Sequence, residues 1–110
     1  MNILFLCTSN MHRSKTAEDY FKNLDHNNHY KSAGLNERNC IRYGSRVCTE
    51  ELLQWADKVF VMEQKHIDRI RMYTEEKYMH KVINLEIDDD FGYMDPNLLN
   101  IIISKTGKYL

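Results

Sequence analysis

The sequence predicts an α/β fold in which helices cover both faces of a four-stranded parallel sheet, a three-layer α/β/α arrangement. Two observations predict it. Strand-like and helix-like segments alternate along the 110 residues, and the first strand-like run, Ile3 to Cys7, is apolar throughout, as in a strand buried on both faces. The length suits one hydrophobic core, so we expect a single domain over residues 1–110.

The first half of the chain continues with a helix, a strand and a second helix. Apolar side chains at helical spacing predict a helix from about Ser14 to Leu24. A short second strand, Tyr30–Ala33, ends at Gly34. Thr49 resembles the N-cap of a short helix, because its hydroxyl can accept a backbone hydrogen bond there. The stretch 35–47, rich in Asn, Arg and Gly, shows no readable period.

The second half repeats the alternation. The run "KVFVM" predicts a strand at Lys58–Met62, and the pattern after it predicts a helix from Gln64 to about Tyr78. The run "KVINL" predicts the fourth strand at Lys81–Leu85. Pro96 suits the first turn of a last helix, where its missing N–H costs nothing. An acidic loop separates this helix from the fourth strand.

Composition and charge exclude several classes of protein. The formal net charge of −1 argues against broad binding to nucleic acid or to an anionic membrane. No segment approaches the roughly 20 apolar residues that span a bilayer, and the short N-terminal apolar run lacks the features of a signal peptide. Three irregularly spaced cysteines do not form a disulfide framework, so we expect reduced thiols and a cytoplasmic protein.

A cysteine, five residues, an arginine and a serine connect the first strand to the first helix, from Cys7 to Arg13 and Ser14. Such a loop can point several backbone N–H groups into one concavity, and the helix N-terminus adds positive charge, so the concavity favours an anion. The guanidinium of Arg13 offers donors that match two phosphate oxygens. The alternative interpretation is a small buried cysteine beside a solvated helix arginine.

The same loop suits a cysteine nucleophile. Its positive field favours the thiolate form of Cys7, and the hydroxyl of Ser14 can donate a hydrogen bond to that thiolate. Asn10 lies in the middle of the loop, and asparagine tolerates the left-handed backbone that a tight cradle needs. These residues predict a nucleophile that attacks a bound tetrahedral oxyanion.

The loop "LCTSNMHRS" resembles the phosphate-binding loop of the low-molecular-weight protein tyrosine phosphatases, which share a Cys-x5-Arg-Ser signature. The stretches "SAG" at 32–34, "TEELLQWADKVFVME" at 49–63 and "IDDDFG" at 87–92 agree in order, so the resemblance covers most of the chain and is closest to a compact bacterial branch. It implies the fold of that family and hydrolysis of protein phosphotyrosine through a phosphocysteine on Cys7, with no cofactor. The phosphate-binding residues that it implies are Thr8, Ser9, Asn10, Met11, His12, Arg13 and Ser14.

The general acid of that family is an aspartate in a loop that matches "DDF" here. Protonating the leaving oxygen and then activating water both require such a group. The resemblance implies Asp89 in this role, with Asp90 in the place of the family's proline, and repulsion from neighbouring carboxylates would favour the protonated form of Asp89. Asp88 and Asp90 remain alternative acids. Asp95, in "MDP", suits the N-cap of the last helix better than catalysis.

The sequence departs from the family at three places. Ser9 stands where glycine is common, His12 replaces a second cysteine that would protect the nucleophile, and the segment 35–47 is shortened. Met11 is expected to flank the leaving group. Because the related arginine phosphatases have threonine there, Met11 favours phosphotyrosine over phosphoarginine. Phe91 and Tyr93 are possible walls of the substrate pocket, with ordinary packing as the alternative.

Two other functions stay open. An arsenate reductase of the same fold would need two further thiols, and Cys40 and Cys48 precede the third strand instead of following it. A non-catalytic reader would bind phosphorylated partners without turnover. His26 and His29 have ligand-like spacing but no clustered partners, so we expect no metal site. The expected partner is a phosphorylated protein or a small aryl phosphate, bound by a monomer by default, and the oligomeric state is left open.

Overall fold

The computed structural model describes all residues, 1–110. Its four strands form one parallel sheet in the order β2-β1-β3-β4. In chain order, the elements are β1 Asn2–Cys7, α1 Arg13–Leu24, β2 His29–Gly34, α2 Glu37–Tyr43, α3 Glu50–Trp55, β3 Lys58–Val61, α4 Gln64–Thr74, a 3₁₀ turn Met79–Lys81, β4 Val82–Asn84 and α5 Pro96–Thr106.

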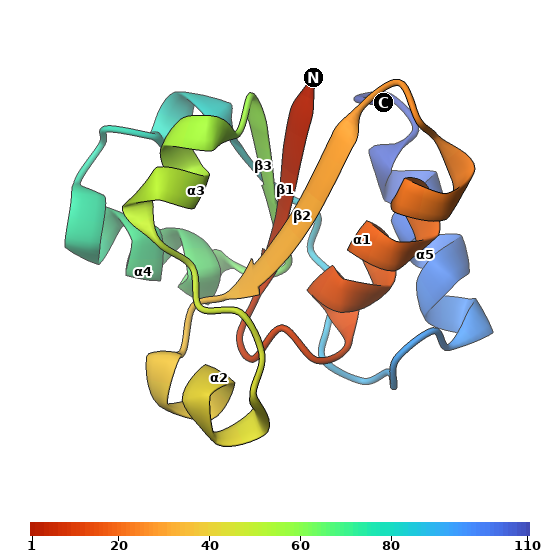
Figure 1. Cartoon of the computed structure of the whole chain (residues 1–110), viewed down its shortest axis with the longest axis horizontal. Helices are drawn as coiled ribbons and strands as arrows, with labels where there is room; N and C mark the ends of the chain where they lie inside the picture. The colour runs from red at the N-terminus through yellow and green to blue at the C-terminus, as the bar shows by residue number, and fades with distance from the viewer.

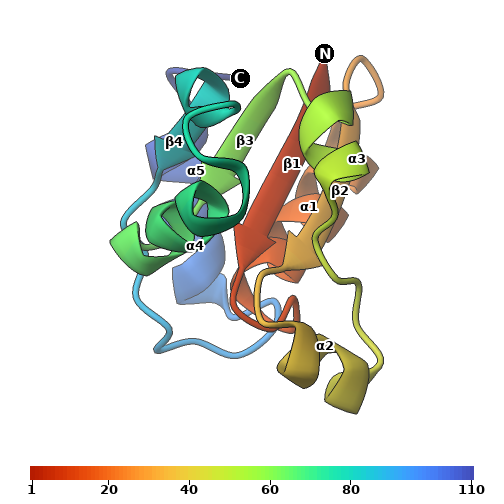
Figure 2. The same cartoon turned by 90° about the vertical axis from the view of Figure 1, so that its left-hand side faces the viewer.

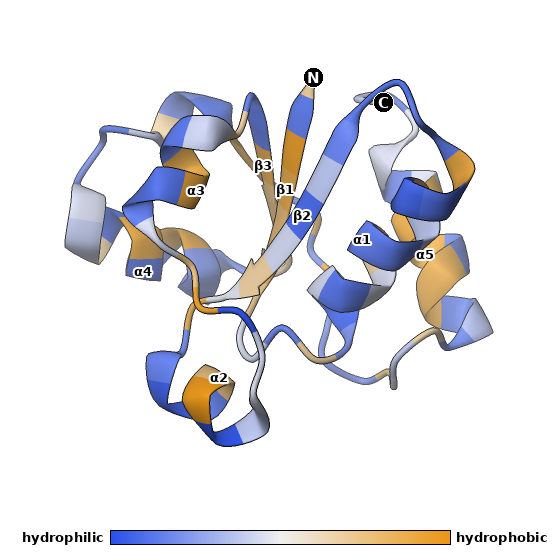
Figure 3. Ribbon diagram, viewed as in Figure 1, coloured by the Kyte–Doolittle hydropathy of each residue, from blue (hydrophilic) through white to orange (hydrophobic).

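Helices cover both faces of the sheet, which confirms the predicted three-layer arrangement. Helices α1 and α5 lie on one face, and α3 and α4 lie on the other (Figure 1). Each face has its own cluster of buried apolar side chains, one centred on Phe5 and Phe60 and the other on Leu4, Val59 and Ile70. The middle of β1 is drawn as hydrophobic in Figure 3, whereas most of α1 is hydrophilic, because β1 is buried on both faces and α1 on one.

Helix α2 stands apart from these layers, beyond the carboxyl ends of β1 and β2 (Figure 2). The sequence analysis missed it. Its ends nevertheless carry two ordinary signals, since the Asn36 side chain accepts a hydrogen bond from the Asn39 N–H and Gly44 ends the helix at φ +70°. The helix between these two signals is short and has no long apolar period, so hydrophobic periodicity alone does not predict it.

The boundaries of the other elements agree with the predictions to within one or two residues, except at the end of α4. The prediction carried this helix to about Tyr78, but it ends at Thr74, and Glu75 follows with φ +56°. Tyr78 is buried against the α3–α4 side of the sheet, and its hydroxyl donates to Glu50. Burying the Tyr78 ring therefore takes the chain out of the helix.

Both predicted helix starts are confirmed. The Thr49 side chain accepts a hydrogen bond from the Leu52 N–H at the start of α3. Pro96 opens α5, and Asp95 caps it by accepting from the Asn97 N–H. No helix of the structure combines the length and the apolar character that crossing a membrane requires.

Candidate active site

A hollow of about 280 Å³ lies at the carboxyl end of β1, where the chain turns into α1. We call it the Cys7 hollow. Its lining brings together residues from the first loop, from α2 and from the loop after β4, namely Cys7, Thr8, Ser9, Met11, His12, Arg13, Tyr43 and Asp89. The expected meeting of the first loop with the acidic loop at one edge of the sheet is thus observed.

Three polar atoms form a chain beneath the Cys7 hollow. The sulfur of Cys7 lies 2.9 Å from Ser14 Oγ, and Ser14 Oγ donates to Asn10 Oδ1 at 2.8 Å. Asn10 is buried and has φ +55°, the left-handed conformation expected of it. While the Ser14 hydroxyl donates its hydrogen bond to Asn10, a Cys7 thiol can donate to Ser14 Oγ. A Cys7 thiolate can only accept, so the Ser14 hydroxyl must turn and donate to the sulfur instead. The protonation state of Cys7 and the orientation of the Ser14 hydroxyl are therefore coupled.

The guanidinium of Arg13 is almost fully buried, with 1% of the side chain exposed. Its NH1 donates to Glu63 Oε2 at 2.6 Å and to the carbonyl of Ile87 at 2.7 Å. Its Nε has no hydrogen-bond partner, and the nearest carboxylate oxygen, of Asp89, lies 3.6 Å away. One edge of the guanidinium is therefore fixed by the protein while Nε remains free to bind an oxyanion.

Glu63 holds that fixed edge. Burial by itself would raise the pKa of Glu63, but the hydrogen bond and the charge of Arg13 outweigh burial and lower the pKa. The carboxylate is therefore ionised near neutral pH and neutralises part of the buried arginine charge. Sequence analysis missed this residue, since its contact with Arg13 spans 50 positions of the chain.

The loop between β1 and α1 packs against the segment that connects the end of β2 to the start of α2. The N–H groups of Leu35 and Asn36 donate to the carbonyls of Cys7 and Thr8, both at 2.9 Å. Gly34 makes this approach possible, because a Cβ there would lie 2.8 Å from the Thr8 carbonyl oxygen and 3.0 Å from the Ser9 carbonyl carbon. Ser9 is held on the same side.

The helix α2 region supplies the contacts of Ser9. Its hydroxyl accepts a hydrogen bond from the Asn39 side chain at 3.2 Å, and its carbonyl accepts from Ser45 Oγ at 2.5 Å. Residues of the segment 35–47 thus hold both the side chain and the backbone of Ser9 in place.

His66 supports the loop from α4, and its tautomer follows from its partners. Ring atom Nδ1 accepts from the N–H groups of Met62 and Glu63, at 3.2 and 3.0 Å. The proton of the neutral ring therefore sits on Nε2, which donates to Thr8 Oγ1 at 3.0 Å. Burial, together with the charge of Arg13, lowers the pKa of His66 to about 4, so the ring stays neutral at pH 7.

The three aspartates of the acidic loop are all exposed, but they are placed differently. Asp89 lines the Cys7 hollow and lies near Arg13. Asp88 and Asp90 neither line the hollow nor form an ion pair with a basic side chain. Of the three aspartates, only Asp89 lines the Cys7 hollow.

Neither of the two possible aromatic walls, Phe91 and Tyr93, lines the Cys7 hollow. Phe91 packs against the buried cluster around Phe5, so ordinary packing accounts for it. Tyr93 hydrogen-bonds Asp19 and lines a neighbouring wider hollow of about 810 Å³, which shares Met11 with the Cys7 hollow. The aromatic residue that does line the Cys7 hollow is Tyr43, at the end of the unpredicted helix α2.

The three cysteines form no disulfide. Cys40 is buried with its sulfur 4.0 Å from the Thr8 carbonyl, and Cys48 is half-buried before α3. Burial, together with nearby Cys40, raises the pKa of Cys48 to about 12. No cluster of three or more potential metal-ligating side chains occurs, and His26 and His29 are both exposed.

Searches with protein-family models and among curated proteins find no match to this chain. Solved structures do match. A low-molecular-weight protein tyrosine phosphatase from T. tengcongensis is 24% identical over 100% of this chain and 99% of its own, with a TM-score of 0.72. Vibrio vulnificus Wzb in complex with benzylphosphonate is 20% identical over 98% and 95%, with a TM-score of 0.78.

A YwlE arginine phosphatase mutant with a phosphorylated active-site serine is also similar, at 24% identity over 99% of this chain and 97% of its own, with a TM-score of 0.70. Each likeness spans nearly the whole of both chains. The chain therefore has the fold of the low-molecular-weight protein tyrosine phosphatases.

Proposed function

We propose that this protein is a cysteine-dependent phosphatase that hydrolyses phosphotyrosine in proteins. The observation that carries the proposal is that Cys7 and Arg13 line one hollow at the start of α1, and that the buried Nε of Arg13 has no hydrogen-bond partner. Glu63 neutralises part of the Arg13 charge, and the free Nε donor can bind an oxyanion that the adjacent thiol attacks. The similar structures, one with benzylphosphonate and one with a phosphorylated active-site serine, support this chemistry.

The reaction has two steps in this geometry. The Cys7 thiolate, with the Ser14 proton turned toward it, attacks phosphorus as the bond from phosphorus to the leaving oxygen breaks. Arg13 and the loop N–H groups stabilise the equatorial oxygens, and protonated Asp89 gives its proton to the leaving phenolate.

Water completes the cycle. It attacks the phosphorus of the phosphocysteine while the Asp89 carboxylate takes one of its protons, and the bond from phosphorus to sulfur breaks. Inorganic phosphate leaves and the Cys7 thiolate is restored. Arg13 keeps the same position through both steps because Glu63 and the Ile87 carbonyl fix its other edge.

An aryl substrate fits the rest of the lining. Met11 and Tyr43 stand at the mouth of the Cys7 hollow, with 38% and 54% of each residue exposed, and present apolar surface to a phenyl ring. The arsenate reductase alternative is disfavoured because neither Cys40 nor Cys48 lines the Cys7 hollow, so no second thiol stands beside the Cys7 sulfur there.

We further propose that residues 1–110 act as one domain in a bacterial cytoplasm. One sheet with both faces covered supports the single domain. A nucleophilic thiol with no disulfide in the chain suits a reducing compartment.

The test is hydrolysis of p-nitrophenyl phosphate in the presence of a metal chelator. We expect turnover by the wild type, none by Cys7→Ser, and near wild-type turnover by Cys48→Ser, which removes a thiol outside the Cys7 hollow. Turnover that survives in Cys7→Ser contradicts the mechanism. A wild type that binds vanadate but shows no turnover is a phosphate reader instead.

A further inference from the structure

Three hollows follow one another on the surface, and each shares lining residues with the next. Thr8 lines the Cys7 hollow and also a second hollow of about 220 Å³. Leu35 and Arg69 line this second hollow and a third of about 270 Å³ between α3 and α4. A bound chain that leaves the Cys7 hollow across Thr8 and then passes Leu35 meets the other two in order.

The second hollow, which we call the Lys65 hollow, is basic. Its lining consists of Thr8, Leu35, Asn36, Lys65, His66 and Arg69, without a carboxylate. The lowered pKa of His66 keeps that ring neutral, so the charges of the lining are those of the two cations.

Both cations of the Lys65 hollow lack a dedicated partner. The ammonium of Lys65 lies 3.7 Å from Glu63, whose carboxylate already binds Arg13 at 2.6 Å. Arg69 takes part in no ion pair, and its Nε is buried without a hydrogen-bond partner. An acidic group in the Lys65 hollow would meet two cations and the Asn36 amide, and its charge would be attracted at short range.

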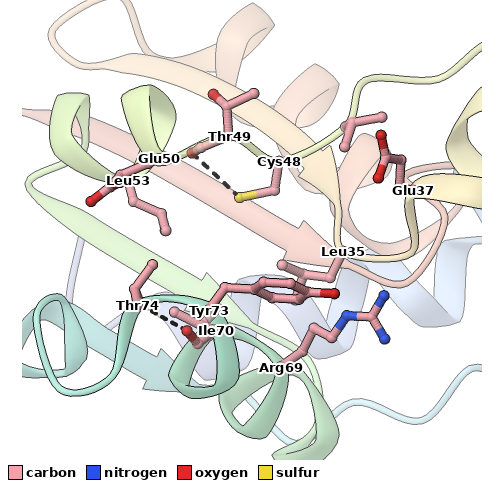
Figure 4. A pocket seen from close by; sticks show the side chains of 11 residues that line it. Leu35, Glu37, Cys48, Thr49, Glu50, Leu53, Arg69, Ile70, Tyr73 and Thr74 are labelled. Atoms are coloured by element: carbon pink, nitrogen blue, oxygen red, sulfur yellow. Dashed lines mark hydrogen bonds between the residues drawn. The ribbon is translucent and has the colours of Figure 1, made fainter.

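The third hollow, which we call the Leu53 pocket, has a mixed lining in which apolar side chains stand beside the carboxylates of Glu37 and Glu50. Figure 4 shows Leu35, Leu53, Ile70 and the ring of Tyr73 around it, with Arg69 at one end. Leu53 and Ile70 are buried, whereas Tyr73 is exposed and stands beside Arg69. An aliphatic side chain that entered this pocket would cover apolar surface that is now accessible.

We infer that these hollows together bind one extended segment of a phosphoprotein, with phosphotyrosine in the Cys7 hollow, an acidic side chain in the Lys65 hollow and an aliphatic side chain in the Leu53 pocket. The inference rests on the proposed function and names its substrate class. The Cys7 hollow and the Lys65 hollow share Thr8 in their linings, and an extended chain advances about 3.3–3.6 Å per residue, so we place the acidic residue within a few positions of the phosphotyrosine. A small aryl phosphate would use the first hollow alone.

The experiment measures kcat/KM on phosphotyrosine peptides and divides it, for each enzyme variant, by kcat/KM on p-nitrophenyl phosphate. This ratio cancels general effects on the Cys7 loop. The peptides carry Asp or Asn within two positions of phosphotyrosine, on either side, and Leu or Gly beyond it. For the wild type we expect a preference of about five- to tenfold for Asp, which weakens as salt is raised.

Substitutions on α4 distinguish an effect of the two cations in the Lys65 hollow from an effect of other charges on the same helix. Lys65→Gln and Arg69→Gln should each reduce the Asp preference about two- to fivefold, and the double variant should abolish it. Arg71→Gln, on the same helix but paired with exposed Glu76 and outside the three hollows, should keep the preference. Thermal unfolding checks that each variant is folded.

The outcomes separate the two proposals. A wild type that hydrolyses p-nitrophenyl phosphate but shows no Asp preference, or an Asp preference that survives the double variant, overturns the peptide site and leaves the phosphatase intact. Equal rates for Leu and Gly peptides overturn the role of the Leu53 pocket. A wild type without turnover of p-nitrophenyl phosphate overturns the proposed function itself.

Discussion

Arg13 Nε and Asp89 Oδ1 lie 3.6 Å apart across the Cys7 hollow, although 76 positions separate the two residues in the chain. The separation is too long for a hydrogen bond, and Nε has no other partner. The exposed carboxylate of Asp89 therefore faces the space that an oxyanion bound to Arg13 would occupy. In the proposed reaction, this relationship places Asp89 beside the developing leaving group.

The first prediction concerns Asp89. In Asp89→Asn, kcat should fall about 10²- to 10³-fold for phosphotyrosine and less for p-nitrophenyl phosphate, whose leaving phenolate needs less protonation. The alkaline limb of the pH–rate profile should disappear. Asp88→Asn and Asp90→Asn are the matched controls, since neither residue lines the hollow. A comparable loss in either control would move the acid to that position.

The second prediction concerns Gly34. In Gly34→Ala, the added Cβ would collide with the Thr8 carbonyl and the Ser9 backbone, and with the sulfur of Cys40. Because backbone atoms cannot move aside as a side chain can, we expect the loop to shift and kcat/KM to fall about tenfold to a hundredfold. Stability should fall by about 1–3 kcal/mol.

Steady-state kinetics and urea unfolding measure both effects. Gly107→Ala is the control, because its Cβ would make only ordinary contacts, the nearest at 3.5 Å. Full activity in Gly34→Ala would show that the loop does not depend on this close approach.

The residues that sequence reasoning found are those that local pattern or topology brings together. Cys7, Ser14 and Arg13 belong to one strand–loop–helix unit, so their spacing alone predicts their meeting. Asp89 joins them because parallel strands end at the same edge, and the loop after β4 therefore opens toward the loop after β1.

The residues that it missed depend on how particular helices pack. Tyr43 lines the Cys7 hollow because it lies at the end of α2, the helix between Asn36 and Gly44. Hydrophobic periodicity does not predict this helix. Glu63 and His66 look like ordinary helix-start residues, and their roles arise from contacts with Arg13 and Thr8 across the sheet edge. The place of Phe91 also depends on packing. From the sequence, an aromatic residue in a loop fits a pocket wall or the core equally well, and in the structure Phe91 packs against the core.

The third prediction concerns Tyr43. In Tyr43→Ala, KM for phenyl phosphates should rise about three- to tenfold with little change in kcat, because the lost ring contacts the substrate equally before and during the reaction. An alkyl phosphate should show a smaller change. Ile41→Ala is the control, as Ile41 lies on the same helix, is also exposed to solvent, and lines none of the hollows described above. Equal KM values in Tyr43→Ala and wild type would remove Tyr43 from the substrate wall.

The fourth prediction is a pH dependence of stability that originates at His66. The pKa of this ring falls from 6.5 in an unfolded chain to about 4 in the folded protein. Between these values the unfolded state binds more protons, so the contribution of His66 to stability is complete above pH 6.5 and is lost as the pH falls toward 4. Protonation of Nδ1 would break its hydrogen bonds with the N–H groups of Met62 and Glu63.

Urea unfolding at several pH values measures this effect. From pH 7.5 to pH 5, the wild type should lose roughly 2 kcal/mol through His66. In His66→Gln the protein should be less stable at pH 7.5, because the two backbone donors lose their acceptor, but its stability should change little over the same range. His26→Gln removes an exposed histidine and should follow the wild type. A wild-type stability that is flat from pH 7.5 to pH 5 would show that the folded protein accommodates the charged ring.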